Sequence, residues 1–175
     1  MITIKRIACI DATTLQVLHN LLKACIEQGA SLGFYASTAT GLLCSYWHTV
    51  AKEVSHNQRL LYILYDKGEI QATVQLALCL KQNGRHRADV EKLLVQPSSH
   101  RQGYASKLMA YVESEARQQG IQLLVLDTQS GDKAERFYHA IGYSKVGQIP
   151  YYVSDVSGKL FSTSYYYKYL IAHSQ

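Results

Sequence analysis

The chain has 175 residues, of which 47% are hydrophobic and 18% are charged, and its formal net charge is +5. This length and the abundance of apolar residues are typical of one compact domain and exclude an intrinsically disordered chain. No apolar run approaches the roughly 20 residues that cross a bilayer, and the charged N-terminal stretch excludes a secretory signal. We therefore expect a single domain over residues 1–175 that is cytoplasmic and has no membrane partner.

The first half of the chain predicts one strand, two helices and three further strands. Residues 1–11 alternate like a strand, and apolar residues at three- and four-residue steps predict a helix from Thr14 to Gly29. A loop with two glycines separates this helix from a second one over residues 43–54. Strand-like runs then follow, with Lys67-Gly68 and Asn83-Gly84 between them as hairpin turns; these runs cover residues 60–65, 70–80 and 87–95.

The second half alternates helix and strand. A helical stripe over residues 105–116 ends at Gly120, and an almost wholly apolar strand follows over residues 121–127. Asp132 and Glu135 form a variant of the capping box and open a helix that Gly142 closes. Two last strands, 143–152 and 163–170, flank a turn, and the tyrosines of the last strand are predicted to pack against the sheet. The order βααβββαβαββ predicts an α+β fold, a sheet with helices on its faces.

Four cysteines are spread along the chain without a C-x-x-C pair or a nearby histidine arrangement. This spacing indicates buried, reduced thiols and no metal site. The four residues are Cys9, Cys25, Cys44 and Cys79.

The stretch Val90–Ala105 carries a strand, Pro97, a short polar loop and Gly103 at the start of an amphipathic helix. Because the first N–H groups of a helix have no intrahelical partners, and the macrodipole adds positive charge, this end favours a phosphate. Arg101, His100 and Lys107 would add donors there. An ordinary strand-to-helix connection is the alternative reading of the same pattern.

The residues His100-Arg-Gln-Gly-Tyr-Ala105 resemble the R/Q-x-x-G-x-G/A motif of the GNAT superfamily of N-acetyltransferases, whose element order also matches. The resemblance implies a mixed, mostly antiparallel sheet and acetyl-CoA as cosubstrate. It implies that main-chain N–H groups bind the pyrophosphate, and that amides left free by a splay between the fourth and fifth strands meet the pantetheine arm and the developing oxyanion. The cofactor-binding positions would be Leu93, Leu94, Val95, His100, Arg101, Gln102, Gly103, Tyr104 and Ala105.

A second match is Ala134-Glu-Arg-Phe-Tyr-His-Ala-Ile-Gly-Tyr143, which is similar to the A-x-x-x-Y-x-x-x-G-F/Y signature of the same superfamily. The resemblance makes Tyr138 the general acid toward the departing CoA thiolate. A phenol with an ordinary pKa near 10 stays protonated at neutral pH and can donate its proton. The alternative is a core aromatic. Gly131 stands where the family usually has Asn, so one cofactor contact is absent.

The C-terminal half is also similar to tabtoxin-resistance acetyltransferases, which implies a small amine acceptor, amino-acid-like or resembling an antibiotic or toxin. The loop Gly29-Ala-Ser-Leu-Gly33 shares this likeness. We expect the acceptor site between the first two helices and the C-terminal hairpin. Its candidate residues are Ser31, Phe34, Tyr35, Tyr151 and Tyr152.

Attack by an amine requires a group that removes its proton. We expect Asp89 and Glu91 on opposite faces of the fourth strand, so that at most one faces the cleft, and Asp127 at the end of the next strand is the third candidate. The resemblance favours Asp89 slightly over Asp127 and leaves Glu91 for a surface charge pair. No Ser or Cys has an activated setting, which favours direct transfer.

Other function classes stay open beside a small-molecule N-acetyltransferase. The fold could serve as a nonenzymatic CoA-binding regulatory module, or the acceptor could be a protein amine. A nucleic-acid partner is disfavoured because the basic cluster at residues 85–87 is not interleaved with the aromatic run at 165–167. A homodimer stays open as well.

Overall fold

The protein is described by a computed structural model over residues 1–170. The predicted order βααβββαβαββ and the α+β class are confirmed. The elements are β1 (Thr3–Ile7), α1 (Ala12–Glu27), α2 (Thr40–Ser55), β2 (Arg59–Asp66), β3 (Glu69–Leu78), β4 (Arg87–Val95), α3 (Tyr104–Gln118), β5 (Leu123–Gln129), α4 (Lys133–Ala140), β6 (Ser144–Ser154) and β7 (Leu160–Tyr169).

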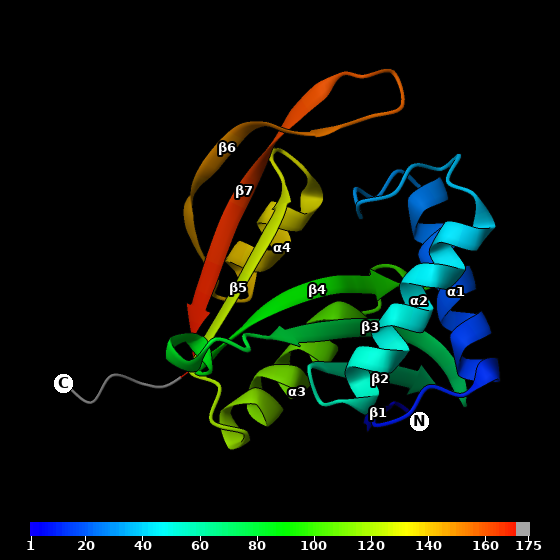
Figure 1. Ribbon diagram of the computed structural model, residues 1–175, viewed down its shortest axis with the longest axis vertical. Helices are drawn as coiled ribbons and strands as arrows, with labels where there is room; N and C mark the ends of the chain where they lie inside the picture. The colour runs from blue at the N-terminus through cyan, green and yellow to red at the C-terminus, as the bar shows by residue number, and fades with distance from the viewer. Residues whose placement is uncertain (171–175) are drawn as a thin grey trace.

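The seven strands form one mixed sheet in the order β1-β2-β3-β4-β5-β7-β6. Every neighbouring pair is antiparallel except β4 and β5, which are parallel. Only residues 87–89 of β4 pair with residues 123–125 of β5, so the two strands diverge beyond that point. Figure 1 shows the consequence: β5, β7 and β6 swing away from the rest of the sheet.

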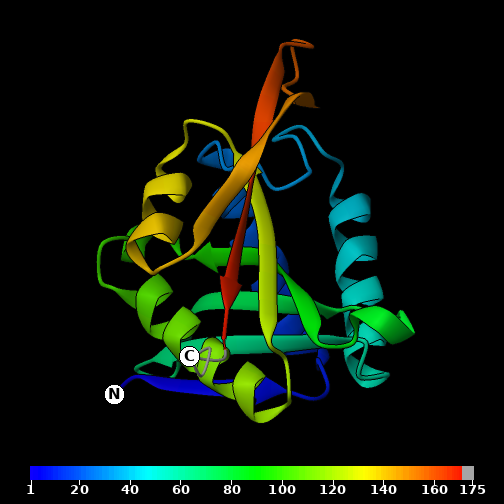
Figure 2. The same cartoon turned by 90° about the vertical axis from the view of Figure 1, so that its left-hand side faces the viewer.

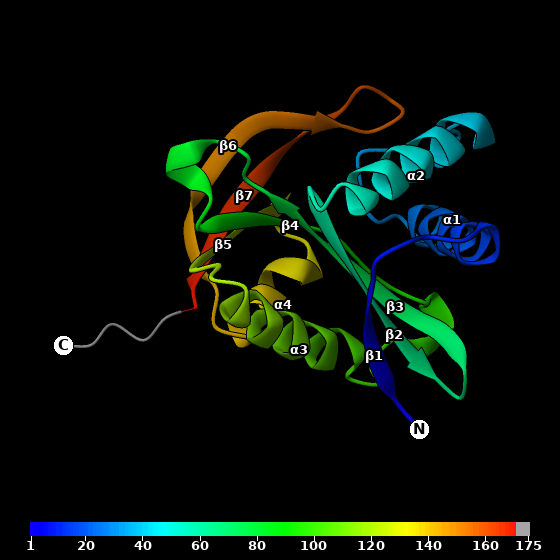
Figure 3. The same cartoon turned by 60° about the horizontal axis from the view of Figure 1, so that its bottom comes forward.

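The helices cover both faces of the sheet. Figure 3 shows α1 and α2 on one face and α3 and α4 on the other. The apolar residues of β2 alternate between the two cores: Tyr62 packs into the core with α3, and Leu61 and Ile63 pack into the core with α1 and α2. A strand buried on both faces needs a nearly continuous apolar run, which the sequence of β2 supplies. None of the helices among residues 1–170 is long and apolar enough to span a membrane.

Two local details differ from the sequence-based expectations. Helix α1 begins at Ala12 because the Asp11 carboxylate accepts a hydrogen bond from the Thr14 N–H at 2.7 Å and caps the helix. The connection from β3 to β4 is longer than a hairpin turn and contains a 3₁₀ turn at residues 82–84. Gly84 packs there against the Cys79 side chain, where a Cβ has no room.

The predicted burial of the cysteines is wrong for Cys9, which is exposed. It lies in the short connection after β1, outside the alternating part of the strand. Cys25 is buried, and Cys44 and Cys79 are half-buried.

The β6–β7 hairpin projects beyond the rest of the molecule, as Figure 2 shows. Strand β6 is the sheet edge, it is exposed along almost its whole length, and its pairing with β7 slips twice. The second slip lies between Ile149 and Val153, and Tyr151 has a left-handed backbone (φ 56°) within it. The hairpin tip meets the connection between α1 and α2, where the hydroxyls of Tyr35 and Ser154 form a 2.7 Å hydrogen bond.

Candidate active site

The start of α3 exposes main-chain N–H groups at the end of β4. Gly103 occupies the N-cap position with φ 75°, and no side chain caps the helix. A Cβ built on Gly103 meets nothing within 4 Å, so the loop is open to a ligand. These are the features of an anion site at a helix N-terminus. The segment therefore has room and main-chain donors for an anion such as a phosphate.

Two side chains of this motif form hydrogen bonds with other residues of the protein. Tyr104 is buried and its hydroxyl donates to the Asp66 carboxylate at 2.8 Å, so only its main chain is available. His100 lies with Nε2 3.2 Å from the Val95 carbonyl oxygen, at the end of β4. Arg101 and Gln102 are exposed.

A β-bulge distorts β4 just before this loop. Thr73 pairs with Leu94 and Gln75 with Glu91, so Lys92 and Leu93 together oppose one residue of β3. Lys92 has a left-handed backbone (φ 49°), a conformation that non-glycine residues adopt mainly at special sites. The bulge lies beyond the last residue of β4 that pairs with β5, so this stretch borders the gap between the two strands.

The main-chain amides of Leu93, Leu94 and Val95 were predicted to meet the developing oxyanion. The side chains of these three residues belong to the core. Leu94 is buried with the α1 and α2 residues, and Leu93 and Val95 pack against the α3 core. The main chain of these residues borders the gap, because β4 has no β5 partner from Val90 onward.

Tyr138 is buried on α4, and its ring packs on Phe137 and Tyr143. Burial raises the pKa of Tyr138 well above its ordinary value, and the charge of Asp127 adds to the shift. Within residues 1–170 its hydroxyl has no hydrogen-bond partner. The Tyr138 phenol therefore stays neutral and protonated at neutral pH.

The N-terminus of α4 is anchored by Glu135. Its carboxylate accepts hydrogen bonds from the Gly131 N–H at 2.8 Å, the Lys145 ammonium at 2.8 Å and the Tyr166 hydroxyl at 3.0 Å. The Lys145 bond is the largest of the causes that lower the pKa of Glu135 to about 2. This network ties α4, and with it Tyr138, to β6 and β7.

The expectation that Asp89 and Glu91 point to opposite faces is wrong. The two residues lie two positions apart in a regular stretch of β4, so their side chains share a face. Val90, between them, packs into the α3 core, which leaves both carboxylates on the α1 and α2 face. Glu91 forms a 2.6 Å ion pair with Arg59, whose side chain is only 12% exposed.

Asp127 lies on the same face of the sheet as Asp89. This is the face toward α1 and α2, and we call it the cleft face. Asp127 follows Val125 by two residues, and Val125 pairs with Asp89. Asp127 is exposed and accepts a 2.8 Å hydrogen bond from the Thr163 hydroxyl. Burial raises the pKa of Asp89, and the negative charges of Glu91 and Asp127 add to the shift.

Tyr165 faces Asp127 directly in the β5–β7 register, so the two side chains are neighbours on the cleft face. Its hydroxyl lies 2.9 Å from that of Tyr152. This hydrogen bond is the largest of the causes that raise the pKa of Tyr165 to about 12, followed by burial and by Asp127. The expected packing role fits Tyr166, which is buried in the α3 core, while Tyr165 is half-buried and packs edge-on against the Tyr152 ring.

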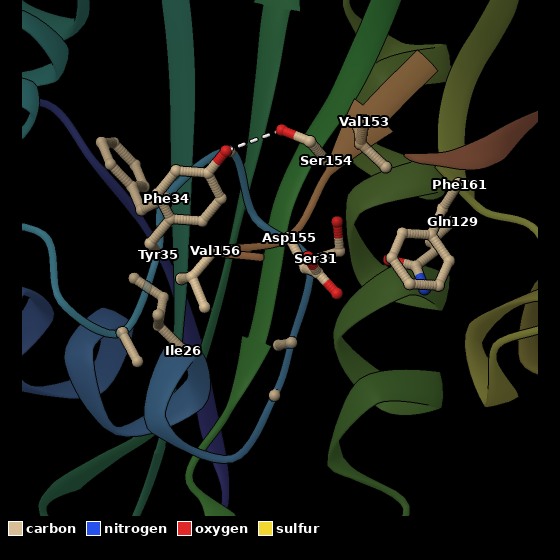
Figure 4. Close-up of a pocket in the computed structure, with 14 residues that line it drawn as sticks. Ile26, Ser31, Phe34, Tyr35, Gln129, Val153, Ser154, Asp155, Val156 and Phe161 are labelled. Carbon is tan, nitrogen blue, oxygen red and sulfur yellow. Dashed lines mark hydrogen bonds between the residues drawn. The ribbon is translucent and has the colours of Figure 1, made fainter. Parts of the chain in front are cut away.

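A cavity of about 370 Å³ lies between the α1–α2 connection and the β6–β7 hairpin (Figure 4). Ser31, Phe34 and Tyr35 line it, as expected. The hydrogen bond between Tyr35 and Ser154 closes one side, and Gln129 and Phe161 lie on the opposite side (Figure 4).

Tyr151 and Tyr152 do not line this cavity. Tyr151 is 76% exposed, because the slip in β6 turns it outward. The tip of the hairpin lines the cavity in their place, with Val153, Ser154, Asp155 and Val156.

Sequence reasoning missed several residues of the cleft. Lys92 and Tyr165 belong to no motif that we recognised in the sequence. The alternation of side chains along β7 could have suggested that Tyr165 pairs with Asp127. Gln129 and Phe161 reach the cavity only through the course of β5 and β7 in space.

Comparison with known proteins agrees with this geometry. The family model described as the acetyltransferase (GNAT) family matches residues 36–143, more than half of the chain. An uncharacterised N-acetyltransferase encoded in the hisH–hisA intergenic region of Azospirillum brasilense is 26% identical over 136 residues, which cover 77% of this chain and 79% of the relative.

Solved structures share the fold at low identity. The putative acetyltransferase yncA from Salmonella typhimurium, solved with its cofactor acetyl-CoA, has a TM-score of 0.79 at 15% identity and covers 100% of this chain and 97% of its own. The ribosomal-protein-S18-alanine N-acetyltransferase of Escherichia coli has a TM-score of 0.72 at 19% identity, with 100% and 98% covered. The chain thus belongs to the GNAT family of acetyltransferases.

Proposed function

We propose that the protein transfers the acetyl group of acetyl-CoA directly to a primary amine of a small molecule, and that the gap between β4 and β5 is the place of transfer. The observation that carries the proposal is this divergence. β4 leads from it to the open start of α3, and β5 leads from it to Asp127, whose charge acts on Tyr138.

The main chain at the start of α3 would hold the pyrophosphate of acetyl-CoA, and the amides of Leu93 to Val95 would face the acetyl carbonyl. When bound, acetyl-CoA supplies a thioester, an acyl group with a good leaving group. Oriented N–H donors at the site where an oxyanion develops are a large source of rate acceleration.

Asp127 is the carboxylate that we propose as the base. It is exposed on the cleft face, and its charge acts on Tyr138 as well as on Asp89. It would take the proton from the acceptor ammonium, so that the amine nitrogen forms its bond to the acetyl carbon while the bond from carbon to sulfur breaks. Asp89 is the alternative base, on the same face.

Tyr138 would then donate its hydroxyl proton to the sulfur as negative charge builds there, and the second proton that the new amide nitrogen loses would return to the Tyr138 oxygen. Its raised pKa keeps the phenol protonated at neutral pH before that step. Burial also raises the pKa of the Cys25 thiol, to about 11, and this thiol contacts the Val95 carbonyl oxygen at 3.5 Å. Such a thiol stays protonated at neutral pH and does not serve as a nucleophile, which supports direct transfer.

A cavity of about 370 Å³ suits a small acceptor. Two measurements test the function. Calorimetry with acetyl-CoA should show binding, and release of free thiol should follow the addition of one or more members of a panel of amino acids, diamines, amine-bearing antibiotics and short peptides.

The absence of acetyl-CoA binding would overturn the whole proposal. Binding without turnover of any amine would support a nonenzymatic CoA-binding module. If only peptides are acetylated, the acceptor is a protein amine and not a small molecule.

A further inference from the structure

Lys92 is placed toward the cleft by the bulge in β4. In a regular strand, consecutive side chains point to opposite faces. Lys92 and Glu91 nevertheless lie on the same face, since Glu91 pairs with Arg59 there and Lys92 contacts the rings of Phe34 and Tyr46. Bulges next to active sites commonly redirect a side chain in this way.

The charges of Glu91 and Asp127 act on the ammonium of Lys92, but neither carboxylate is bonded to it. Within residues 1–170 it forms no ion pair and no hydrogen bond. Its sequence neighbour Glu91 is held by Arg59 at 2.6 Å. The contacts that Lys92 does make are aromatic, with its Nζ 5.5 Å from the ring centre of Tyr46 and 6.0 Å from that of Phe34.

Such a placement is costly for a lysine. Burial lowers the pKa of Lys92, and the negative charges of Glu91 and Asp127 oppose that shift. Aromatic contacts stabilise a cation only in part, whereas a charge removed from water normally requires a hydrogen-bonded counter-ion. A bound ligand can supply the missing anion.

The position of Lys92 assigns that anion to the acceptor. Lys92 itself does not line the cavity, but the Phe34 ring, whose centre lies 6.0 Å from its Nζ, does. The α3 phosphate site begins beyond Val95, at least three strand residues or about 10 Å along β4. Asp127, the proposed base, is close enough for its charge to act on Lys92.

We propose that Lys92 binds a carboxylate of the acceptor, so that the acceptor is a zwitterion of amino-acid type, with its carboxylate at Lys92 and its amine at Asp127. This inference rests on the proposed function and names its substrate class. The Phe34 and Tyr46 rings would then hold the ammonium in place beside the ligand.

The test compares amino acids with their primary amides, which keep the amine and lose the negative charge. For the wild type, kcat/KM should be about 10- to 100-fold higher for the acid than for the amide. In Lys92→Met this ratio should fall to about 1, and Lys92→Arg should restore most of it. Lys67→Met is the matched control, because exposed Lys67 has a similar left-handed backbone (φ 52°) in the turn between β2 and β3.

A second measurement does not depend on turnover. Calorimetric titration of N-acetyl amino acids and of their amides, each in the presence of CoA, should show tighter binding of the acids to the wild type and to Lys67→Met, and no difference for Lys92→Met. Thermal unfolding of each variant checks that it is folded.

Three outcomes would overturn the inference. Equal binding of acids and amides to the wild type would show that no carboxylate site exists, even where acetylation of amides proves the proposed function right. A preference that survives in Lys92→Met would assign the site to another residue. An equal fall of kcat for acids and amides in Lys92→Met would place the ammonium at the thioester carbonyl instead.

Discussion

The two ends of the cleft are built in different ways. The α3 end comes from one continuous stretch, residues 93–105, in which the end of a strand, a short loop and the start of a helix follow one another. The acceptor cavity comes from the α1–α2 connection, the end of β5 and the tip of the β6–β7 hairpin, and its Tyr35–Ser154 bond joins residues 119 positions apart.

The difference predicts that substitutions at the two ends have different effects. A binding site made by main-chain N–H groups depends little on side-chain identity, so it tolerates substitution around Gly103. A cavity made by side chains on loops changes with each loop residue. Substitutions at the gap and the α3 end should therefore act on chemistry and cofactor affinity, and those at the cavity on the acceptor.

The largest effect on activity is expected for a substitution of Tyr138. Tyr138→Phe removes the proposed proton donor and should lower kcat by about 100-fold or more, while calorimetry should show an almost unchanged affinity for acetyl-CoA. Tyr143→Phe is the control, because its ring contacts that of Tyr138 at 5.6 Å between centres. An unchanged kcat in Tyr138→Phe would leave Tyr138 a packing role only.

Asp127→Asn should lower kcat/KM for the amine by about 10- to 100-fold at neutral pH, because the amide cannot accept the ammonium proton. Asp89→Asn should change it less than about fivefold. Since the pKa of Asp89 is raised, a rate that falls on mild acidification and loses this dependence in Asp89→Asn would instead make Asp89 the base. Steady-state kinetics from pH 5 to 9 separate the two.

Gly103→Ala should weaken acetyl-CoA binding by about 10-fold. Both Gly103 and Gly68 have left-handed backbones, φ 75° and 84°, and open space around the missing Cβ. Alanine at either position should therefore cost about 1 kcal/mol of unfolding free energy. Only Gly103→Ala should alter calorimetric binding of acetyl-CoA, and equal affinities in the two variants would move the phosphate site elsewhere.

The smallest effect is expected at the Tyr35–Ser154 bond, which is exposed. Tyr35→Phe and Ser154→Ala should each raise the KM for the acceptor a few-fold and leave the KM for acetyl-CoA unchanged. In a double-mutant cycle on unfolding free energy the two should couple by about 0.5–1.5 kcal/mol. Additive effects would show that the hairpin tip and the α1–α2 connection act independently.

The amino-acid sequence by itself determined the order of elements, the α+β class and the motif at the start of α3. These features depend on local signals, such as the apolar periodicity of the helices, the Asp132 cap and the glycines after helices and in turns. The α3 motif was readable for the same reason, since its parts are neighbours in the chain.

The tertiary structure alone decided which side chains share the cleft. A single added residue in β4 turns Lys92 toward Phe34, and a slip in β6 turns Tyr151 away from the cavity. Periodicity predicts a face only while the register is regular. Bulges, and the divergence of β4 from β5, arise from packing between segments distant in sequence, and those contacts leave no local pattern to read.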